Sequence, residues 1–214
     1  MPEIKERAFE DAIVSVLTTG RMDSASDERS RESSPSFGEF IPGGYRQRDA
    51  ADYNRELCLI PEDVLDFILA TQPKGWTRLK EHYGAEVKDR FLRRLSREIG
   101  RRGTIDVLRK GIKDAGCKFQ VAYFRPASKL NPDLQTLYRA NVFTVIRQLH
   151  YSTSCERSLD LALFLNGIPL FTAEVKNPLN GQTVEDAIKQ YKEDRDPREP
   201  LLAVSYTHLR AHET

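Results

Sequence analysis

The first half of the chain places its apolar residues with the period of an α-helix. Residues 4–17 carry one apolar stripe, and residues 57–83 carry a second helical pattern in which Pro61 suits a first turn. Residues 87–99 give the clearest amphipathic pattern, whose apolar face consists of Val87, Phe91, Leu92, Leu95 and Ile99. These segments are predicted to be helices that each bury one face in a core.

The second half changes to the period of a β-strand. Residues 117–124 alternate, residues 142–149 are rich in β-branched side chains, and residues 159–176 read as two apolar strands folded about Asn166-Gly167. An Asn-Gly pair between apolar strands is the strongest short hairpin signal. We therefore expect a strand that leads into a hairpin.

Helical patterns separate these strands. Asn131 is expected to cap a short helix that begins at Pro132, and Thr183 is expected to cap a helix over residues 184–194. Residues 200–204 then begin another apolar strand, which the sequence leaves incomplete. The order helix, strand, hairpin, helix, strand predicts an α/β fold with a mixed sheet flanked by helices and an additional helical N-terminal part.

Two segments differ in composition from the rest. Residues 20–52 are rich in Ser, Arg, Glu, Gly and Pro, so they are predicted to form a loop or a disordered insertion. Residues 204–214 resemble a translated sequencing-adaptor fragment, so we exclude them from fold reasoning. The exclusion removes His208 and His212, whose helical spacing would otherwise suit zinc. Residues 1–203 are read as one domain.

Three charged residues lie in the apolar hairpin: Asp160, Glu174 and Lys176. Charges in apolar surroundings are costly unless they are paired or bound to a metal. Glu174 and Lys176 are two apart, so on a strand they point to the same face. Two carboxylates and a lysine on one face match the D…ExK arrangement of Mg²⁺-dependent nucleases, in which carboxylate oxygens hold the cation. On spacing alone, a solvated strand face with a Glu/Lys pair is the commoner arrangement.

The strand register decides whether Asp160 and Glu174 can share a metal ion. With a regular two-residue turn, Asp160 would lie opposite Ala173 and face away from Glu174. One extra residue would place Asp160 directly opposite Glu174. We therefore predict a β-bulge or a three-residue loop between Leu165 and Leu170, with both carboxylates on one face.

Arginines cover the polar face of the third helical segment: Arg93, Arg94, Arg97 and Arg101. Such a face either is simply solvated or contacts the phosphates of a nucleic acid, and the sequence supports the two interpretations about equally. The net charge is only +1, so any nucleic-acid contact must come from a local patch of this kind.

Length and composition limit the class of protein. The 214 residues suffice for one substantial α/β domain. The cysteines Cys58, Cys117 and Cys155 show no paired spacing, which fits a reducing cytoplasm better than a disulfide framework or a zinc site. No apolar run is long enough for a membrane span and the N-terminus is not signal-like, so a soluble cytoplasmic protein is expected.

Several short motifs follow one another in an order that resembles a known family. They include Leu57-Cys-Leu-Ile-Pro-Glu-Asp, Arg101-Arg-Gly-Thr, Asn141 through Arg147-Gln148, Ser158-Leu-Asp, Asn166-Gly-Ile-Pro-Leu, Glu174-Val-Lys-Asn-Pro and Ala187-Ile-Lys-Gln-Tyr. From Glu56 to Leu202 the chain resembles the N-terminal nuclease domain of the restriction (R) subunit of type I restriction-modification enzymes, a PD-(D/E)xK nuclease. Each motif is weak alone, but their order is specific.

The resemblance implies that Asp160, Glu174 and Lys176 are catalytic and that Asp160 and Glu174 bind Mg²⁺. It implies a further acidic metal ligand on the first helix, best matched by Glu10, and a glutamine on the helix after the lysine, matched by Gln190. It also implies double-stranded DNA as substrate, methyltransferase and specificity subunits as partners, and a downstream ATP-dependent motor. ATP would belong to that motor, because the chain has no G-x-x-x-x-G-K-[ST] phosphate loop.

The sequence therefore predicts a module that hydrolyses phosphodiester bonds in double-stranded DNA with Mg²⁺, as part of a type I restriction endonuclease. Two alternatives stay open. One is a non-catalytic DNA-binding or docking module in which the carboxylates only support structure. The other is a repair nuclease of another PD-(D/E)xK branch.

Overall fold

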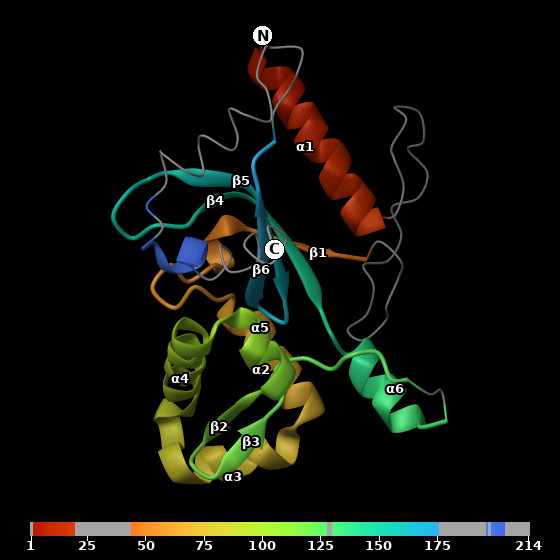
Figure 1. Ribbon diagram of the computed structural model, residues 1–214, viewed down its shortest axis with the longest axis vertical. Helices are drawn as coiled ribbons and strands as arrows, with labels where there is room; N and C mark the ends of the chain where they lie inside the picture. Colours follow the sequence, from red (N-terminus) through yellow and green to blue (C-terminus); the bar gives the residue numbers. More distant parts are fainter. Residues whose placement is uncertain (1, 20–43, 128–129, 176–195, 197, 204–214) are drawn as a thin grey trace, which may run out of the picture.

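The computed structural model describes residues 2–19, 44–127, 130–175, 196 and 198–203. They form a four-stranded mixed sheet accompanied by helix α1 (Pro2–Thr19), and a smaller helical part that contains a two-stranded sheet (Figure 1). Within these ranges no helix combines the length and the hydrophobicity that a bilayer span requires. The predicted mixed α/β architecture is confirmed for this part of the chain.

The larger sheet has the strand order β1-β4-β5-β6. Its strands are β1 (Arg46–Arg48), β4 (Phe143–His150), β5 (Ser158–Leu165) and β6 (Ile168–Ala173). Strand β1 runs parallel to β4, whereas β4 with β5 and β5 with β6 are antiparallel. Each face of this sheet buries a separate apolar cluster, as expected for a sheet with chain packed on both sides.

Helix α1 covers one face of the sheet. Its residue Val14 packs against Val145 of β4, Leu161 of β5 and Val175, which follows β6. The cluster on the opposite face includes Ile60, Ile146, Leu149, Leu159, Ala162, Phe164, Leu201 and Leu202. The sheet is therefore a central layer, and it determines which side chains can reach α1.

The turn between β5 and β6 is buried against the start of α2 (Pro61–Thr71). Asn166 and Gly167 have φ angles of +50° and +76°, and Leu165 pairs with Ile168, so the turn contains two residues. The Gly167 carbonyl oxygen accepts a hydrogen bond from the Ile60 N–H at 2.9 Å. A Cβ atom on Gly167 would lie 2.4 Å from the Ile60 carbonyl oxygen, so only glycine fits this contact.

A β-bulge follows the turn on β6. Phe164 pairs with Pro169, but Leu163 pairs with Phe171, so Leu170 is an extra residue on one strand only. The predicted bulge is confirmed. It lies within the strand, and the alternative three-residue loop is not formed, because the Asn-Gly turn keeps its two-residue geometry.

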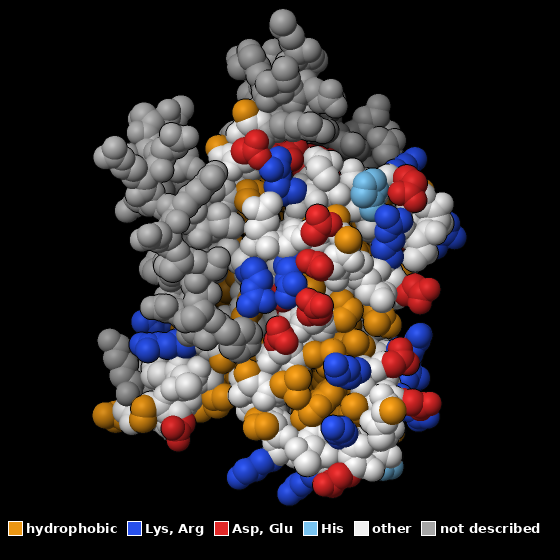
Figure 2. All heavy atoms as spheres, turned by 180° about the vertical axis from the view of Figure 1, so that it is seen from behind, with side chains coloured by type: hydrophobic (Ala, Val, Ile, Leu, Met, Phe, Trp, Pro, Cys, Tyr) orange, Lys and Arg blue, Asp and Glu red, His pale blue; other side chains and the backbone are white. Residues whose placement is uncertain are grey.

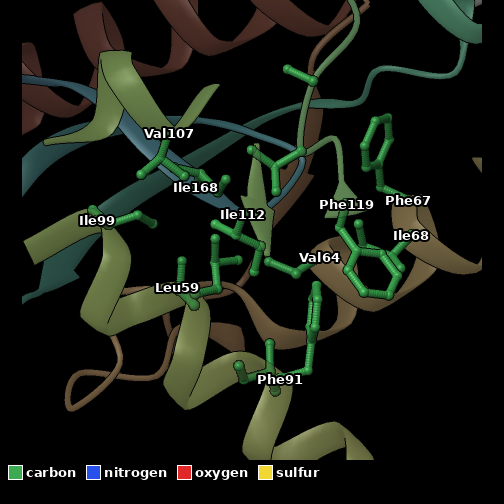
Figure 3. Close-up of a cluster of buried hydrophobic side chains, with 14 of the residues drawn as sticks. Leu59, Val64, Phe67, Ile68, Phe91, Ile99, Val107, Ile112, Phe119 and Ile168 are labelled. Atoms are coloured by element: carbon green, nitrogen blue, oxygen red, sulfur yellow. The ribbon is translucent and has the colours of Figure 1, made fainter. Parts of the chain in front are cut away.

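The smaller part is mainly helical. It consists of α2, α3 (Pro73–Tyr83), the 3₁₀ turn η2 (Gly84–Glu86), α4 (Val87–Arg102), α5 (Thr104–Lys110) and the strands β2 (Ile112–Asp114) and β3 (Cys117–Phe119). Its core draws on all of these helices and strands except η2, and on β6 (Figure 3): Leu59, Val64, Phe67, Ile68, Trp76, Phe91, Ile99, Val107, Ile112, Phe119 and Ile168. Because Ile168 belongs to this core, the β5–β6 hairpin and the helical part are packed together.

Two predicted helix boundaries are confirmed in detail. Pro61 is the first residue of α2, where its missing N–H costs no hydrogen bond. Asn131 caps α6 (Pro132–Arg139) by accepting hydrogen bonds from the N–H groups of Asp133 and Leu134 at 3.0 and 3.2 Å. These boundaries depend on local chemistry, which the sequence displays directly.

Three local predictions are wrong. Residues 46–48, expected in a loop, form β1, and residues 50–52 form the 3₁₀ turn η1 (Ala50–Asp52), whereas residues 20–43 lie outside the described residues. The strand expected over residues 117–124 ends at Phe119 and pairs with β2, which was not predicted. Short segments of this kind owe their conformation to a pairing partner, so their own pattern says little.

The third error concerns residues 200–203, which are helical rather than extended. The Ala203 N–H donates to the Glu199 carbonyl oxygen at 2.9 Å, and Leu201 and Leu202 are buried in the cluster opposite α1. A short apolar run is compatible with either conformation, so its burial was predictable but its backbone was not. The helix expected over residues 184–194 lies outside the described residues.

A buried carboxylate joins β1 to the rest of the fold. The Asp63 side chain is fully buried at the start of α2, and its Oδ1 receives hydrogen bonds from Arg46 and Arg48 at 3.0 and 2.9 Å. Its Oδ2 receives the Thr144 hydroxyl at 2.5 Å. The charge of Asp63 is thus satisfied from β1 and β4 together, which fixes the short parallel strand in place.

Candidate active site

The bulge in β6 sets the position of Asp160 relative to Glu174. Beyond the bulge Leu161 pairs with Ala173, so the next position places Asp160 opposite Glu174, which follows the end of β6. Asp160 is half-buried, and its Oδ2 accepts the backbone N–H of Val175 at 2.7 Å. The Asp160 carboxylate is therefore fixed directly against the segment that carries Glu174.

Helix α1 brings a second carboxylate to Asp160. Glu10 is buried, with only 4% of its surface exposed. The Gln148 side-chain amide donates from its Nε2 to Glu10 Oε1 at 3.1 Å and to Asp160 Oδ1 at 3.4 Å. One amide group thus holds the carboxylates of the first helix and of β5 on either side of itself.

Gln148 owes this position to an unusual backbone conformation. Its φ angle is +46°, in the left-handed region that residues with a side chain rarely adopt. On the neighbouring strand, Leu159 and Leu161 are two apart, yet Leu159 packs in the cluster opposite α1 and Leu161 packs in the cluster with α1. The alternation of side chains is therefore broken at Gln148 and Asp160. Such local strain is characteristic of functional sites.

Arg147 supplies a positive charge beside Glu10 and Asp11. Its Nη2 donates to Glu10 Oε2 at 3.2 Å, and its Nη1 forms an ion pair with Asp11. Its Nε is buried and has no hydrogen-bond partner among the described residues. A buried carboxylate such as Glu10 is costly without a partner, and Arg147 is the cation paired with it.

The structure places some, but not all, of the predicted catalytic residues. Asp160 and Glu10 are brought together through Gln148, and Glu174 is half-buried at the adjoining register position. Lys176 and Gln190 lie outside the described residues. In the described ranges no group of three or more His, Cys, Asp or Glu residues is close enough to hold a metal.

The available donors nevertheless suit a hard cation. Mg²⁺ is usually bound through one or two carboxylates and keeps several of its own water molecules, so it does not require a three-residue protein cluster. Each oxygen of Asp160 accepts one hydrogen bond and retains a further lone pair. Asp160 and Glu174 are therefore a donor set of the right chemical kind.

Sequence reasoning missed Gln148 and Arg147 as parts of this site. Both were noted only as members of a family-like motif at the end of a β-branched strand. The sequence did contain a signal, because Arg147 and Gln148 are polar residues near the end of an apolar strand, where burial is expected. Buried polar side chains need polar partners. What could not be seen was the contact with α1, which comes from the start of the chain.

The arginines predicted to contact DNA lie on α4, in the helical part, and not beside Asp160 (Figure 1). Arg93 pairs with Asp89 at 2.9 Å, and Arg94 and Arg101 pair with Glu98 at 3.1 and 3.0 Å. Arg97 donates to the carbonyl oxygen of Arg93 at 3.2 Å. On the face seen in Figure 2, positive and negative side chains likewise lie close together rather than in separate fields.

The described structure is a mixed-sheet α/β domain in which Gln148 joins the carboxylates of Glu10 on α1 and Asp160 on β5. The sequence matches the family described as Type I restriction enzyme R protein N terminus (HSDR_N) over residues 72–208. This match spans more than half of the chain, so the chain belongs to that family. No significant match was found among curated proteins or among solved structures.

Proposed function

We propose that this domain is the endonuclease module of a type I restriction enzyme R subunit and that it hydrolyses phosphodiester bonds in double-stranded DNA. The observation that carries the proposal is the joining of Glu10 and Asp160 by Gln148, opposite Glu174, in a chain of this family. A purely structural pair of carboxylates would not need a strained glutamine between them.

In this proposal Asp160 and Glu174 hold Mg²⁺. The bound cation would supply a water of lowered pKa and would offset the charge that develops on the phosphate. Glu10 acts through Gln148, which orients the Asp160 carboxylate, while Arg147 holds Glu10 in place through their ion pair. Lys176 orients the attacking water or contacts the scissile phosphate. Gln190 is proposed to face the same site.

The proposed setting is a larger complex. Methyltransferase and specificity subunits would select the DNA sequence, and an ATP-dependent motor of the same R subunit would move the DNA. ATP would be bound by that motor and not by this domain. The domain itself would contribute the hydrolysis.

The test uses the restriction complex assembled with an R subunit that carries this domain, with its DNA, ATP and Mg²⁺. The variants Asp160→Asn, Glu174→Gln and Lys176→Ala should each abolish DNA cleavage and leave ATP hydrolysis near the wild-type rate, because they act on the phosphodiester and not on the motor. Their losses should be far from additive when combined, since they disable one unit. Cleavage at the wild-type rate in these variants would instead support a docking module.

A further inference from the structure

A basic groove lies on the helical part, between α4–α5 and the β2–β3 hairpin. It consists of two adjoining hollows of about 340 and 580 Å³, which share Arg94 and Lys113 on their walls. Seven of the nine residues that line the larger hollow are Lys or Arg, and one is Glu. We call this feature the α4–β2 groove.

Three arginines of α4 are fixed at the groove by one buried carboxylate. Glu98 is 4% exposed and forms ion pairs with Arg94, Arg101 and Arg102 at 3.0–3.1 Å. Arg102 also donates to the carbonyl oxygen of Gly111 at 3.1 Å, which ties α4 to the start of β2. These guanidinium groups are held in place before any ligand arrives, so a ligand would not bear the entropic cost of ordering them.

Both sides of the groove also carry cations without acidic partners, Arg109 on α5 and Lys113 and Lys118 on the hairpin. Arg109, Lys113 and Lys118 are exposed, and none of them forms an ion pair with a described residue. In the larger hollow the described ion pairs with acids involve Glu98 and Asp106, which can neutralise at most two of its seven positive charges. A net positive charge therefore remains in the groove, although the whole chain carries only +1.

The lining indicates what kind of anion the groove fits. Among the described residues, Tyr83 is the one aromatic side chain that lines either hollow, and its hydroxyl is engaged with Asp114 at 2.7 Å. Proteins that bind single strands use exposed aromatic rings to stack bases, whereas here the Arg90 guanidinium already lies over the Tyr83 ring, 5.2 Å from its centroid. A surface of fixed arginines and free lysines suits a backbone of regularly spaced phosphates.

We propose that the α4–β2 groove binds the sugar-phosphate backbone of duplex DNA. This binding does not require the hydrolytic reaction. The inference rests on the proposed function for the choice of DNA as the bound anion. The surface that it assigns is separate from the carboxylate site of Asp160 and Glu174. In Figure 1 α4, β2 and β3 lie in the lower part of the molecule, whereas α1 lies at the top. Of the arginines singled out from the sequence, Arg94, Arg97 and Arg101 line this groove and Arg93 does not.

The test measures equilibrium binding of a fluorescein-labelled duplex to the 214-residue chain by anisotropy, with a chelator present so that hydrolysis plays no part. The triple variant Arg109→Ala/Lys113→Ala/Lys118→Ala should bind more weakly. The slope of log K against log salt should fall by about 0.9 for each phosphate that the groove no longer neutralises. Because these residues are exposed and form no described ion pair, the variant should unfold at the wild-type denaturant midpoint.

The matched control removes the same charge elsewhere on the helical part. Lys74→Ala/Lys80→Ala/Lys88→Ala takes three exposed lysines that do not line the groove. It should keep the wild-type salt slope. An equal loss of duplex affinity in both triple variants would show that binding depends on the net charge of the chain and not on the groove. That result would overturn the proposal.

Two further ligands distinguish the alternatives. A single strand of the same length bound more tightly than the duplex, or a polyglutamate chain that competes as well as duplex DNA, would also overturn the proposal. The outcome does not depend on the hydrolytic assignment. If Asp160→Asn left cleavage intact, the nuclease assignment would fail. The binding measurement would still test whether the groove binds duplex DNA.

Discussion

Glu10 and Asp160 are connected through one side-chain amide, although they come from the first helix and from the third strand of the larger sheet. Gln148 Nε2 lies 3.1 Å from Glu10 Oε1 and 3.4 Å from Asp160 Oδ1. The two carboxylates therefore depend on each other's position, because any shift of α1 changes the hydrogen bond that Gln148 offers to Asp160. This dependence makes Gln148 the most informative residue to change.

Gln148→Ala is expected to lower DNA cleavage by about 10- to 100-fold, the usual effect of losing a group that orients a metal ligand. The concentration of Mg²⁺ that gives half-maximal cleavage should rise as well, which a merely structural role would not predict. Gln47→Ala is the control, since Gln47 is an exposed glutamine of the same sheet. An unchanged Mg²⁺ requirement in Gln148→Ala would remove Gln148 from the site.

Asp63→Ala should destabilise the fold by about 3–5 kcal/mol, because it leaves Arg46, Arg48 and the Thr144 hydroxyl without their buried carboxylate. Urea denaturation followed by circular dichroism measures the change. Glu62→Ala is the neighbouring control. The Glu62 side chain is 69% exposed and, among the described residues, pairs with Arg48, so its loss should cost about 0–1 kcal/mol. Equal midpoints for the two variants would contradict the assigned role of Asp63.

Gly167→Ala and Gly100→Ala are expected to change stability in opposite directions. Gly167 has a φ angle of +76° and no room for a Cβ beside Ile60, so alanine should cost about 1–3 kcal/mol for the backbone conformation, with the clash added. Gly100 lies in α4, and the position that a Cβ would take there has nothing within 4 Å, so alanine should stabilise the fold by about 0.4–1 kcal/mol. If both denaturation midpoints moved in the same direction, the buried turn would not require glycine at position 167.

Glu98 should make the stability of the fold depend on pH on the acid side. Hydrogen bonds from Arg101 and Arg102 and the charge of Arg94 hold the pKa of Glu98 below its ordinary value, against the opposing effect of burial. A carboxyl whose pKa is lower in the folded state stabilises the fold above its unfolded pKa, which is about 4.3. That contribution is lost as the pH falls through the lowered folded value.

The measurement compares the wild-type chain with Glu98→Gln in urea denaturation at pH 7 and at a series of lower values. The wild-type midpoint should fall more steeply than the variant midpoint once the pH drops below about 5. Glu86→Gln serves as control, because the Glu86 side chain is 65% exposed and its one ion pair within the described part of the chain is with Arg90. Parallel curves for wild type and Glu98→Gln would show that the arginine cluster does not favour the ionised acid.

The sequence by itself determined the features that depend on neighbours along the chain. Helical periodicity placed the buried face of α4, Pro61 and Asn131 marked helix starts, and Asn166-Gly167 fixed the turn. A bulge or a three-residue loop between Leu165 and Leu170 was predicted on the premise that Asp160 and Glu174 share a metal, because strand alternation brings them opposite each other only if one residue is added, and the bulge is the form that occurs. Such signals act within a few residues, so they are readable without the fold.

The tertiary structure alone decided the features that depend on distant partners. Residues 46–48 became a strand because β4 offered a parallel edge and Asp63 bound the arginines, and residues 200–203 became helical while burying the leucines that the sequence had marked as apolar. The broken alternation at Asp160, and the bond of Gln148 to Glu10, arise only when α1 packs on the sheet. Their physical cause is the burial of charges brought together from separate segments, for which no local pattern exists.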